Sequence, residues 1–178
     1  MLPFNWGELL QTNRVWLRTV IAARGARNAD EVDDIFQNVA LAAVRQQAPI
    51  RDPAKAVPWL YRLAVIQTAL YRRAKGRYRK RVSCQETIPE TENFVSKERE
   101  PIDWLLREER KKMVTAAMEQ LAPPVREILL LKYVHDWSYS EMAEKLGTTV
   151  SAVQSKLHRA RIALKKEILA GAGSKKRI

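Results

Sequence analysis

Residues 137–166 read WSYSEMAEKLGTTVSAVQSKLHRARIALKK, and this stretch carries the clearest structural pattern in the chain. Met142, Ala143 and Leu146 fall on one face of a predicted short helix. Gly147 ends that helix, because glycine readily adopts the positive φ that a helix end often requires. The second part repeats apolar residues at intervals of three and four, which predicts a longer helix with one buried stripe: Val150, Val153, Leu157, Ala160 and Leu164. A short helix, a glycine turn and a longer helix are typical of a helix-turn-helix.

The opposite side of the longer helix carries hydrogen-bonding and cationic groups: Gln154, Ser155, His158 and Arg159. Side chains of these types, on the second helix of a helix-turn-helix, read base edges in the major groove of DNA. An ordinary helical hairpin with a solvated basic face is the alternative interpretation. The motif and the charge together favour DNA binding.

Polar residues near the predicted helix starts can accept hydrogen bonds from the free amides of a first turn. On this ground we expect Ser140 to cap the shorter helix and Thr148 or Thr149 to cap the longer one. Asp30 is expected to cap a helix near the N-terminus.

The composition predicts an all-α protein. The chain has 178 residues, 46% of them apolar, which is enough for one mid-sized domain or two small ones. Only 6 residues are glycine, and the long stretches show helical periodicity without two-residue alternation.

The net charge of +12 predicts a polyanionic partner, because lysine and arginine gain affinity by releasing the counterions of phosphates. An anionic membrane surface is the competing polyanion, but no apolar run approaches the roughly 18 residues that span a bilayer. The N-terminus lacks the layout of a signal peptide, and Cys84 is the only cysteine, so we expect a cytoplasmic protein without a disulfide. One cysteine and two separated histidines are too few for a structural zinc site, and we expect neither a metal nor a cofactor.

An acidic, amide-rich patch follows the first predicted helix, which covers about residues 6–24. Asp33, Asp34, Gln37 and Asn38 gather on one polar surface of the next helix. Acidic residues in a first turn suit the helix dipole, which explains one or two carboxylates in this segment but not the whole patch. In a basic protein, such a patch indicates a surface for a protein partner.

A dense basic run ends the third predicted helix, which begins near Trp59, after a loop bracketed by Pro49, Pro53 and Pro58. Seven of the ten residues 72–81 are cations, and Tyr71 and Tyr78 lie among them. Cations at a solvated helix end complement the helix dipole, but seven cations exceed what this interaction requires. Aromatic rings beside cations favour contact with single-stranded nucleic acid, because bases stack on the rings while phosphates meet the charges.

The composition changes abruptly after this run. Residues 83–105 are acidic, polar and interrupted by two prolines, which indicates a linker. We therefore expect two small helical domains, at 1–82 and 106–170, followed by a basic tail at 171–178.

The C-terminal half, from LAPPVREILLLKY through SYSEMAEKLG to LHRARIAL, resembles region four of bacterial RNA polymerase sigma factors, most of all the extracytoplasmic-function (ECF) group. The segments DDIFQNVALAAVR and PWLYRLA resemble region two of the same family. The resemblance covers roughly residues 8–82 and 106–168. It implies a non-enzymatic specificity subunit that binds core RNA polymerase and both double-stranded and melted promoter DNA. An anti-sigma factor is a further partner that the resemblance suggests.

The resemblance also assigns roles to residues. Asp33, Asp34, Gln37 and Asn38 would dock on the polymerase. Recognition of the minus-thirty-five element would use Gln154, Ser155, His158 and Arg159, with Lys156 and Arg161 nearer the phosphates. Capture and melting of the minus-ten element would use Trp59, Arg62, Gln67, Arg72, Arg73, Lys75 and Arg77.

The sequence departs from the family pattern at three positions in the promoter-melting and recognition helices. Ile66 and Leu70 stand in the promoter-melting helix where the family commonly has polar residues, and Ile66 cannot donate a side-chain hydrogen bond to a base. Gln67 is the nearest amide, about 100° around the helix. Gln154 stands where lysine or arginine is usual, which favours adenine over guanine.

Two other classes of function are compatible with parts of the sequence. A stand-alone helix-turn-helix regulator would share the C-terminal half but leave the acidic patch and the basic run without a role. An enzyme acting on nucleic acid would need metal ligands, and Asp33 and Asp34 project about 100° apart on a helix. The sequence therefore favours the sigma factor.

Overall fold

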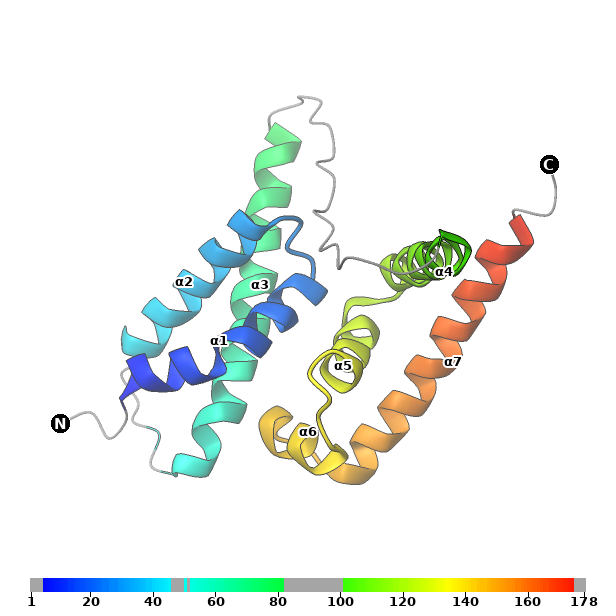
Figure 1. The fold of residues 1–178 in the computed structure, drawn as a ribbon. Helices are drawn as coiled ribbons and strands as arrows, with labels where there is room; N and C mark the ends of the chain where they lie inside the picture. The colour runs from blue at the N-terminus through cyan, green and yellow to red at the C-terminus, as the bar shows by residue number, and fades with distance from the viewer. Residues whose placement is uncertain (1–4, 46–49, 51, 82–100, 175–178) are drawn as a thin grey trace.

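The structure, a computed structural model, describes residues 5–45, 50, 52–81 and 101–174. Within these ranges all regular structure is helical, which confirms the all-α prediction. Figure 1 shows two groups of helices side by side, one from each half of the chain. The predicted linker lies outside the described residues except at its end, where residues 101–105 are helical.

The first half is a three-helix unit in which each helix packs against the other two. Asn13 is buried on the first helix because its side chain is satisfied locally, by the Leu9 carbonyl at 2.7 Å and the Trp16 indole at 2.9 Å. The cap of the second helix is Asn28, whose side chain accepts from the Glu31 amide at 2.9 Å, so the expectation of Asp30 was wrong. The elements are α1 (Trp6–Ala23), α2 (Ala29–Arg45), the short turn η1 (Pro53–Lys55) and α3 (Ala56–Arg81).

The second half is built on its last helix, which packs against the other three. The elements are α4 (Pro101–Gln120), α5 (Pro123–Tyr133), α6 (Tyr139–Leu146) and α7 (Val150–Ser174). Helix α7 therefore continues into the expected tail, whose last residues, 175–178, lie outside the described ranges.

Helices α6 and α7 form the predicted helix-turn-helix. The turn contains Gly147 at φ 62°, as the sequence predicted, and Thr149 caps α7 by accepting from the Ala152 amide. The cap of α6 is Ser138, not Ser140. Ser138 and Glu141 satisfy each other's backbone amides in a capping box, which requires a glutamate three residues after the cap.

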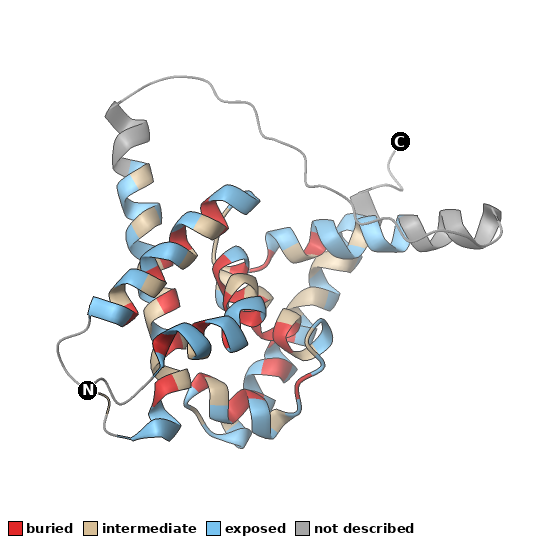
Figure 2. Cartoon of the chain, turned by 60° about the vertical axis from the view of Figure 1, so that its left-hand side comes forward, coloured by how far each residue is buried: buried red, intermediate tan, exposed pale blue. Residues whose placement is uncertain are grey.

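The two halves pack directly against each other along a seam, where α1 meets α5 and α3 meets α6. Buried residues in Figure 2 line the facing sides of both halves and belong to one continuous apolar cluster. Trp16 of α1 meets Trp137 edge to face, with 5.4 Å between ring centroids, and the Lys145 ammonium lies over both rings. At one end of the seam, a Cβ added to Gly147 would lie 3.0 Å from the Pro58 Cβ.

A buried carboxylate joins three helices across this seam. Glu127 of α5 is only 3% exposed, accepts a hydrogen bond from the Tyr61 hydroxyl of α3 at 2.8 Å and forms an ion pair with Arg24, the C-cap of α1. Arg24 also donates to the Tyr61 hydroxyl at 3.2 Å. We call these three residues the seam triad. Burying an unpaired carboxylate is strongly unfavourable, so Glu127 requires both partners, and the halves are held in register.

None of the helices in the described ranges is both long and apolar enough to cross a membrane.

Tyr61 gives the seam a dependence on alkaline pH. Burial, together with the Glu127 carboxylate, raises the pKa of the Tyr61 hydroxyl from 10 to about 12. A raised pKa in the folded state stabilises the fold fully below pH 10 and progressively less between pH 10 and 12. We predict that Tyr61→Phe lowers the free energy of unfolding by about 1–3 kcal/mol at pH 8, through the lost hydrogen bonds.

Above pH 10 the deficit of Tyr61→Phe relative to the unaltered chain should shrink, and most of it should be lost by pH 12. Urea unfolding at several pH values measures it. A deficit that stays constant from pH 8 to pH 12 would contradict the assignment of this hydroxyl to the seam triad.

Candidate functional site

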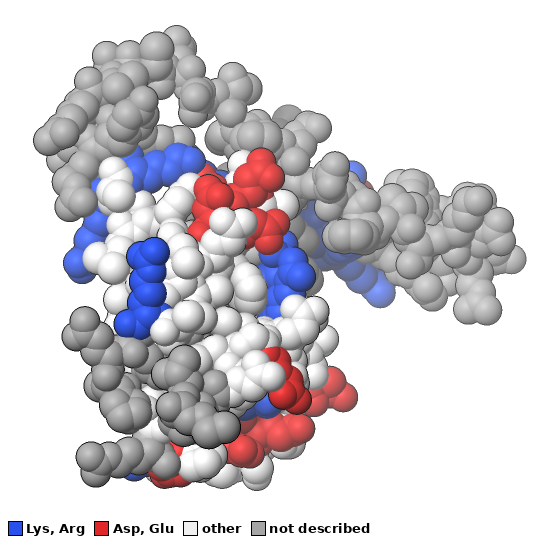
Figure 3. Space-filling model, turned by 90° about the vertical axis from the view of Figure 1, so that its left-hand side faces the viewer, with Lys and Arg blue, Asp and Glu red and all other residues white. Residues whose placement is uncertain are grey.

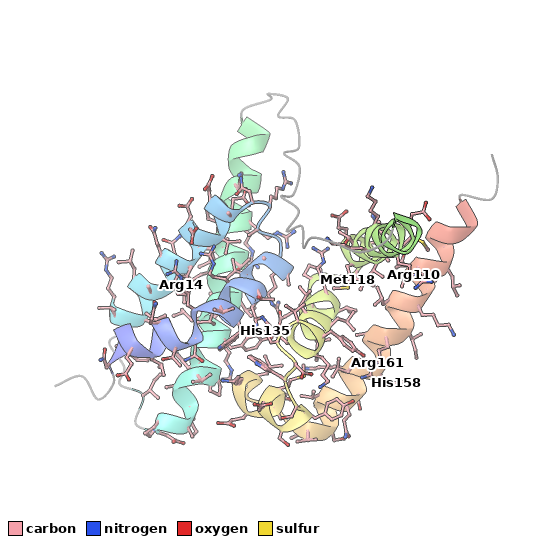
Figure 4. The ribbon with its side chains drawn as sticks, in the orientation of Figure 1. Arg14, Arg110, Met118, His135, His158 and Arg161 are labelled. Carbon is pink, nitrogen blue, oxygen red and sulfur yellow. The ribbon has the colours of Figure 1, made fainter. Side chains whose placement is uncertain are left out.

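Helix α7 presents a polar, basic face to solvent. Val153, Leu157 and Ala160 are buried beneath it, against the rest of the second half. The predicted DNA-reading side chains are all exposed on this helix: Gln154, Ser155, Lys156, His158, Arg159 and Arg161. Figure 4 marks two of them, His158 and Arg161, on α7. This face can donate hydrogen bonds and positive charge to a groove of DNA.

Arg161 is held in place by two tyrosines that the sequence analysis did not single out. Its Nε donates to the Tyr133 hydroxyl at 2.8 Å, one of its terminal nitrogens lies 3.5 Å from the Tyr139 hydroxyl, and its guanidinium lies 5.8 Å from the Tyr133 ring centroid. These hydrogen bonds raise the pKa of the exposed Arg161 guanidinium. The tyrosines restrict the rotamers of a side chain that would otherwise move freely.

Helix α2 exposes the predicted acidic, amide-rich patch. Asp34, Gln37 and Asn38 are exposed, whereas Asp33 is half-exposed and forms an ion pair with Arg18 of α1. Figure 3 views the molecule from the side where α2 lies and shows acidic side chains gathered in separate groups, with basic side chains nearby. A patch with three free polar side chains and one anchored carboxylate is suited to a protein contact that includes hydrogen bonds.

Helix α3 buries one face and exposes the opposite one. Leu60, Ala64 and Thr68 are buried in the first half. The exposed face has a row of four long side chains, two cationic at the ends and two apolar in the middle: Arg62, Ile66, Leu70 and Arg73. We call this row the α3 stripe. Gln67 is half-buried and lies on the flank of the helix, away from the stripe.

Two cations of the predicted basic run are used inside the first half. Lys75 forms an ion pair with Glu31, whose side chain is buried at the start of α2. Arg72 donates to the Arg24 carbonyl at 3.2 Å, next to the turn between α1 and α2. Helix α3 continues through Arg77, but the side chain of Arg77 lies outside the described residues. Arg72 and Lys75 therefore stabilise the α1–α2 turn.

Trp59 lies where the two halves meet. Its ring packs on Trp6 with 5.4 Å between centroids. It also lines a cavity of about 610 Å³ whose walls come from the segment before α3, from α3 itself and from the helix-turn-helix turn: Ile50, Asp52, Lys55, Pro58, Trp59, Arg62 and Gly147. An aromatic ring beside a lysine and an arginine is suited to a nucleobase with its phosphate.

The sequence has relatives of known function. The family described as "Sigma-70, region 4" matches residues 111–164. The ECF RNA polymerase sigma-E factor of Escherichia coli strain K12 is 32% identical over 143 residues, which cover 78% of this chain and 74% of that protein. The RNA polymerase sigma factor HrpL of Pseudomonas syringae pv. syringae is 29% identical over 152 residues, or 85% of this chain and 80% of that protein.

Solved structures share the fold. The sigma factor RpoE, in a co-crystal with the anti-sigma factor NepR from Bartonella quintana, superposes with a TM-score of 0.62 at 16% identity, covering 92% of this chain and 96% of that one. CnrH, in complex with the cytosolic domain of CnrY, gives a TM-score of 0.52 at 23% identity, covering 93% of this chain and 88% of that one.

Two substitutions of a cation by methionine test whether Lys75 stabilises the fold while Arg73 does not. Although burial alone would raise the pKa of Glu31, hydrogen bonds from Lys75 and the Arg27 amide hold it below its usual value. We predict that Lys75→Met lowers the free energy of unfolding by about 1–3 kcal/mol at pH 7, because it leaves a buried carboxylate without its cation. Arg73→Met should stay within about 0.5 kcal/mol.

The depressed pKa of Glu31 stabilises the fold above pH 4.5, and this contribution is lost as the pH falls below that value. The difference between Lys75→Met and the unaltered chain should shrink accordingly in acid. Urea unfolding at pH 7 and at pH 4 measures both effects. Equal destabilisation by the two substitutions would contradict the structural role of Lys75.

Proposed function

Because the chain belongs to the ECF group of bacterial RNA polymerase sigma factors, we propose that its two halves divide promoter recognition between them. As a sigma factor it binds core RNA polymerase and directs promoter recognition and transcription initiation. Sigma factors are regulatory and non-catalytic, so the chain acts by binding. One observation supports this division of promoter recognition. The two exposed faces proposed to bind DNA, on α3 and α7, belong to different halves of the chain.

The proposed modules are residues 1–82 for polymerase docking and the minus-ten element, and residues 106–170 for the minus-thirty-five element, with 83–105 as the linker and 171–178 as a basic tail. The match to region four at residues 111–164 supports the second module. The three-helix packing of α1, α2 and α3 supports the first.

Helix α7 is the proposed reader of the minus-thirty-five element. Gln154 and Arg159 are exposed and long enough to form bidentate hydrogen bonds with adenine and guanine, each worth about 1–3 kcal/mol of discrimination. Ser155 and His158 lie on the same exposed face, and Lys156 and Arg161 supply charge for the phosphates. The two tyrosines that hold Arg161 reduce the entropy lost when it meets a phosphate.

The minus-ten element is assigned to α3 and the segment before it. Trp59 and Arg62 line the cavity at the start of α3, and Arg73 is exposed three turns further along. Gln67, Arg72, Lys75 and Arg77 complete the predicted set. Of these, Arg72 and Lys75 act by holding α3 against the α1–α2 turn, and DNA can still meet Arg72, which remains exposed.

The acidic patch on α2 is the proposed dock for the polymerase, through Asp33, Asp34, Gln37 and Asn38. The patch is exposed, and α2 lies on the side of the first half away from the second half (Figure 1), which supports this assignment. An anti-sigma factor is a further proposed partner, because one of the two similar structures described above is a complex with an anti-sigma factor and the other is a complex with the cytosolic domain of another protein.

Run-off transcription tests the proposed function and the dock together. Core RNA polymerase with this chain should produce specific transcripts from a pool of genomic fragments that core polymerase alone does not produce. We predict that Asp34→Ala/Gln37→Ala abolishes these transcripts, because it removes two docking side chains, while the affinity of the free chain for DNA stays unchanged.

The matched control is Glu119→Ala/Gln120→Ala, which removes an exposed carboxylate and amide from α4 and should leave transcription intact. DNA binding without polymerase-dependent transcripts or core binding would instead identify a stand-alone regulator. Normal transcription by the α2 double variant would refute the dock but not the sigma function.

A further inference from the structure

The α3 stripe has an unusual exposed centre. Ile66 is 53% exposed and Leu70 is 49% exposed, and they lie one helical turn apart. Single exposed apolar side chains are common on protein surfaces. Here two of them are adjacent, and they stand in the helix that the proposed function assigns to melted promoter DNA.

Cations flank this apolar pair at both ends. Arg62 precedes Ile66 by one turn and Arg73 follows Leu70 by about one turn, on the same exposed face. Neither arginine makes a hydrogen bond or an ion pair with any residue that the structure describes, whereas Arg72 is bonded to the α1–α2 turn. The fold thus leaves the stripe arginines available for an anionic ligand.

The length of the stripe fits a short piece of one nucleic-acid strand. Arg62 and Arg73 are about 16 Å apart along the helix axis, which equals about five nucleotides at a rise of 3.4 Å each. The cavity of about 610 Å³ lies at the Arg62 end, and Trp59 forms part of its wall. A base that leaves the stack could enter this cavity, and the cost of unstacking it is lowest when its strand is already melted.

The chemistry of the centre restricts what it can recognise. Side chains that hydrogen-bond can read the polar edges of bases, but Ile66 and Leu70 can contact only apolar surface. Among the DNA bases, thymine presents such surface on its edge, in its C5-methyl group. An apolar pair between cations therefore matches a strand with phosphates at the arginines and thymine methyl groups at the centre.

We propose that Ile66 and Leu70 select thymine in the melted promoter strand through contact with its methyl group, while Arg62 and Arg73 hold the phosphates on either side. This inference rests on the proposed assignment of the minus-ten element to α3. It makes Ile66 and Leu70 specificity-determining residues, which replace readout by hydrogen bonds at these positions.

Oligonucleotides that differ only in this methyl group test the proposal. Fluorescence anisotropy would compare a labelled 12-nucleotide oligo(dT) with the corresponding oligo(dU), bound to the complex of this chain with core polymerase. The unaltered chain should prefer oligo(dT) by about fourfold or more, the factor expected for burial of one methyl-sized group. Ile66→Asn/Leu70→Asn should bind both equally, with the affinity that the unaltered chain has for oligo(dU).

Three controls define the result. Val15→Asn removes an exposed apolar side chain from α1, at 70% exposure, and should keep the preference for oligo(dT). Ile66→Leu, which stays apolar, should also keep it. Arg73→Met should lower the affinity for both oligonucleotides by the same factor and lower the salt dependence of binding, because both oligonucleotides carry the same phosphates.

Two outcomes would overturn the proposal: no preference for oligo(dT) in the unaltered chain, or a preference that survives in Ile66→Asn/Leu70→Asn. Run-off transcription by the same preparations separates this failure from a failure of the proposed function. Polymerase-dependent transcripts without a methyl preference refute only the thymine contact. A methyl preference without transcripts supports the contact and refutes the sigma role.

Discussion

The buried carboxylate of Glu127 is the constraint on which the arrangement of the two halves depends. Its oxygens meet the Tyr61 hydroxyl and the Arg24 guanidinium, so helices from residues far apart in the sequence converge on one charge. Apolar contacts such as Trp16 with Trp137 supply area, but they tolerate sliding. A buried ion pair does not, because any slip leaves a charge without a partner. This group therefore acts with the direct α3–α6 contacts to fix the position of the helix-turn-helix relative to α3.

Local features of the fold could be predicted from the sequence, and features that join distant residues could not. The spacing of apolar residues and Gly147 predicted the helix-turn-helix, because both act within a few residues. The cap of α6 was misassigned by two residues, although Glu141, three residues after Ser138, carries the signal of a capping box. The seam triad has no sequence signal, since its members are 37 to 103 residues apart.

The sequence predicted the basic run as one group of cations. In the structure, the position of each residue around helix α3 decides whether its side chain faces the protein or the solvent. Residues 72–81 look uniform in sequence, yet Lys75 turns inward to Glu31 while Arg73 faces solvent. The sequence could not assign these roles because the partner of Lys75 lies 44 residues away. Ile66 and Leu70 were noted only as departures from a family pattern. Their exposure beside free arginines makes them a coherent surface.

The contact between Pro58 and the Gly147 turn has a thermodynamic consequence. The seam holds the proposed promoter-reading surfaces of the two halves at one fixed separation. A promoter whose two elements lie at a different separation is bound by both halves only in molecules whose halves have come apart. The affinity measured for a promoter is therefore the intrinsic affinity multiplied by the fraction of open molecules. Any partner that binds only the separated halves raises promoter affinity without touching DNA, and any partner that bridges the seam lowers it.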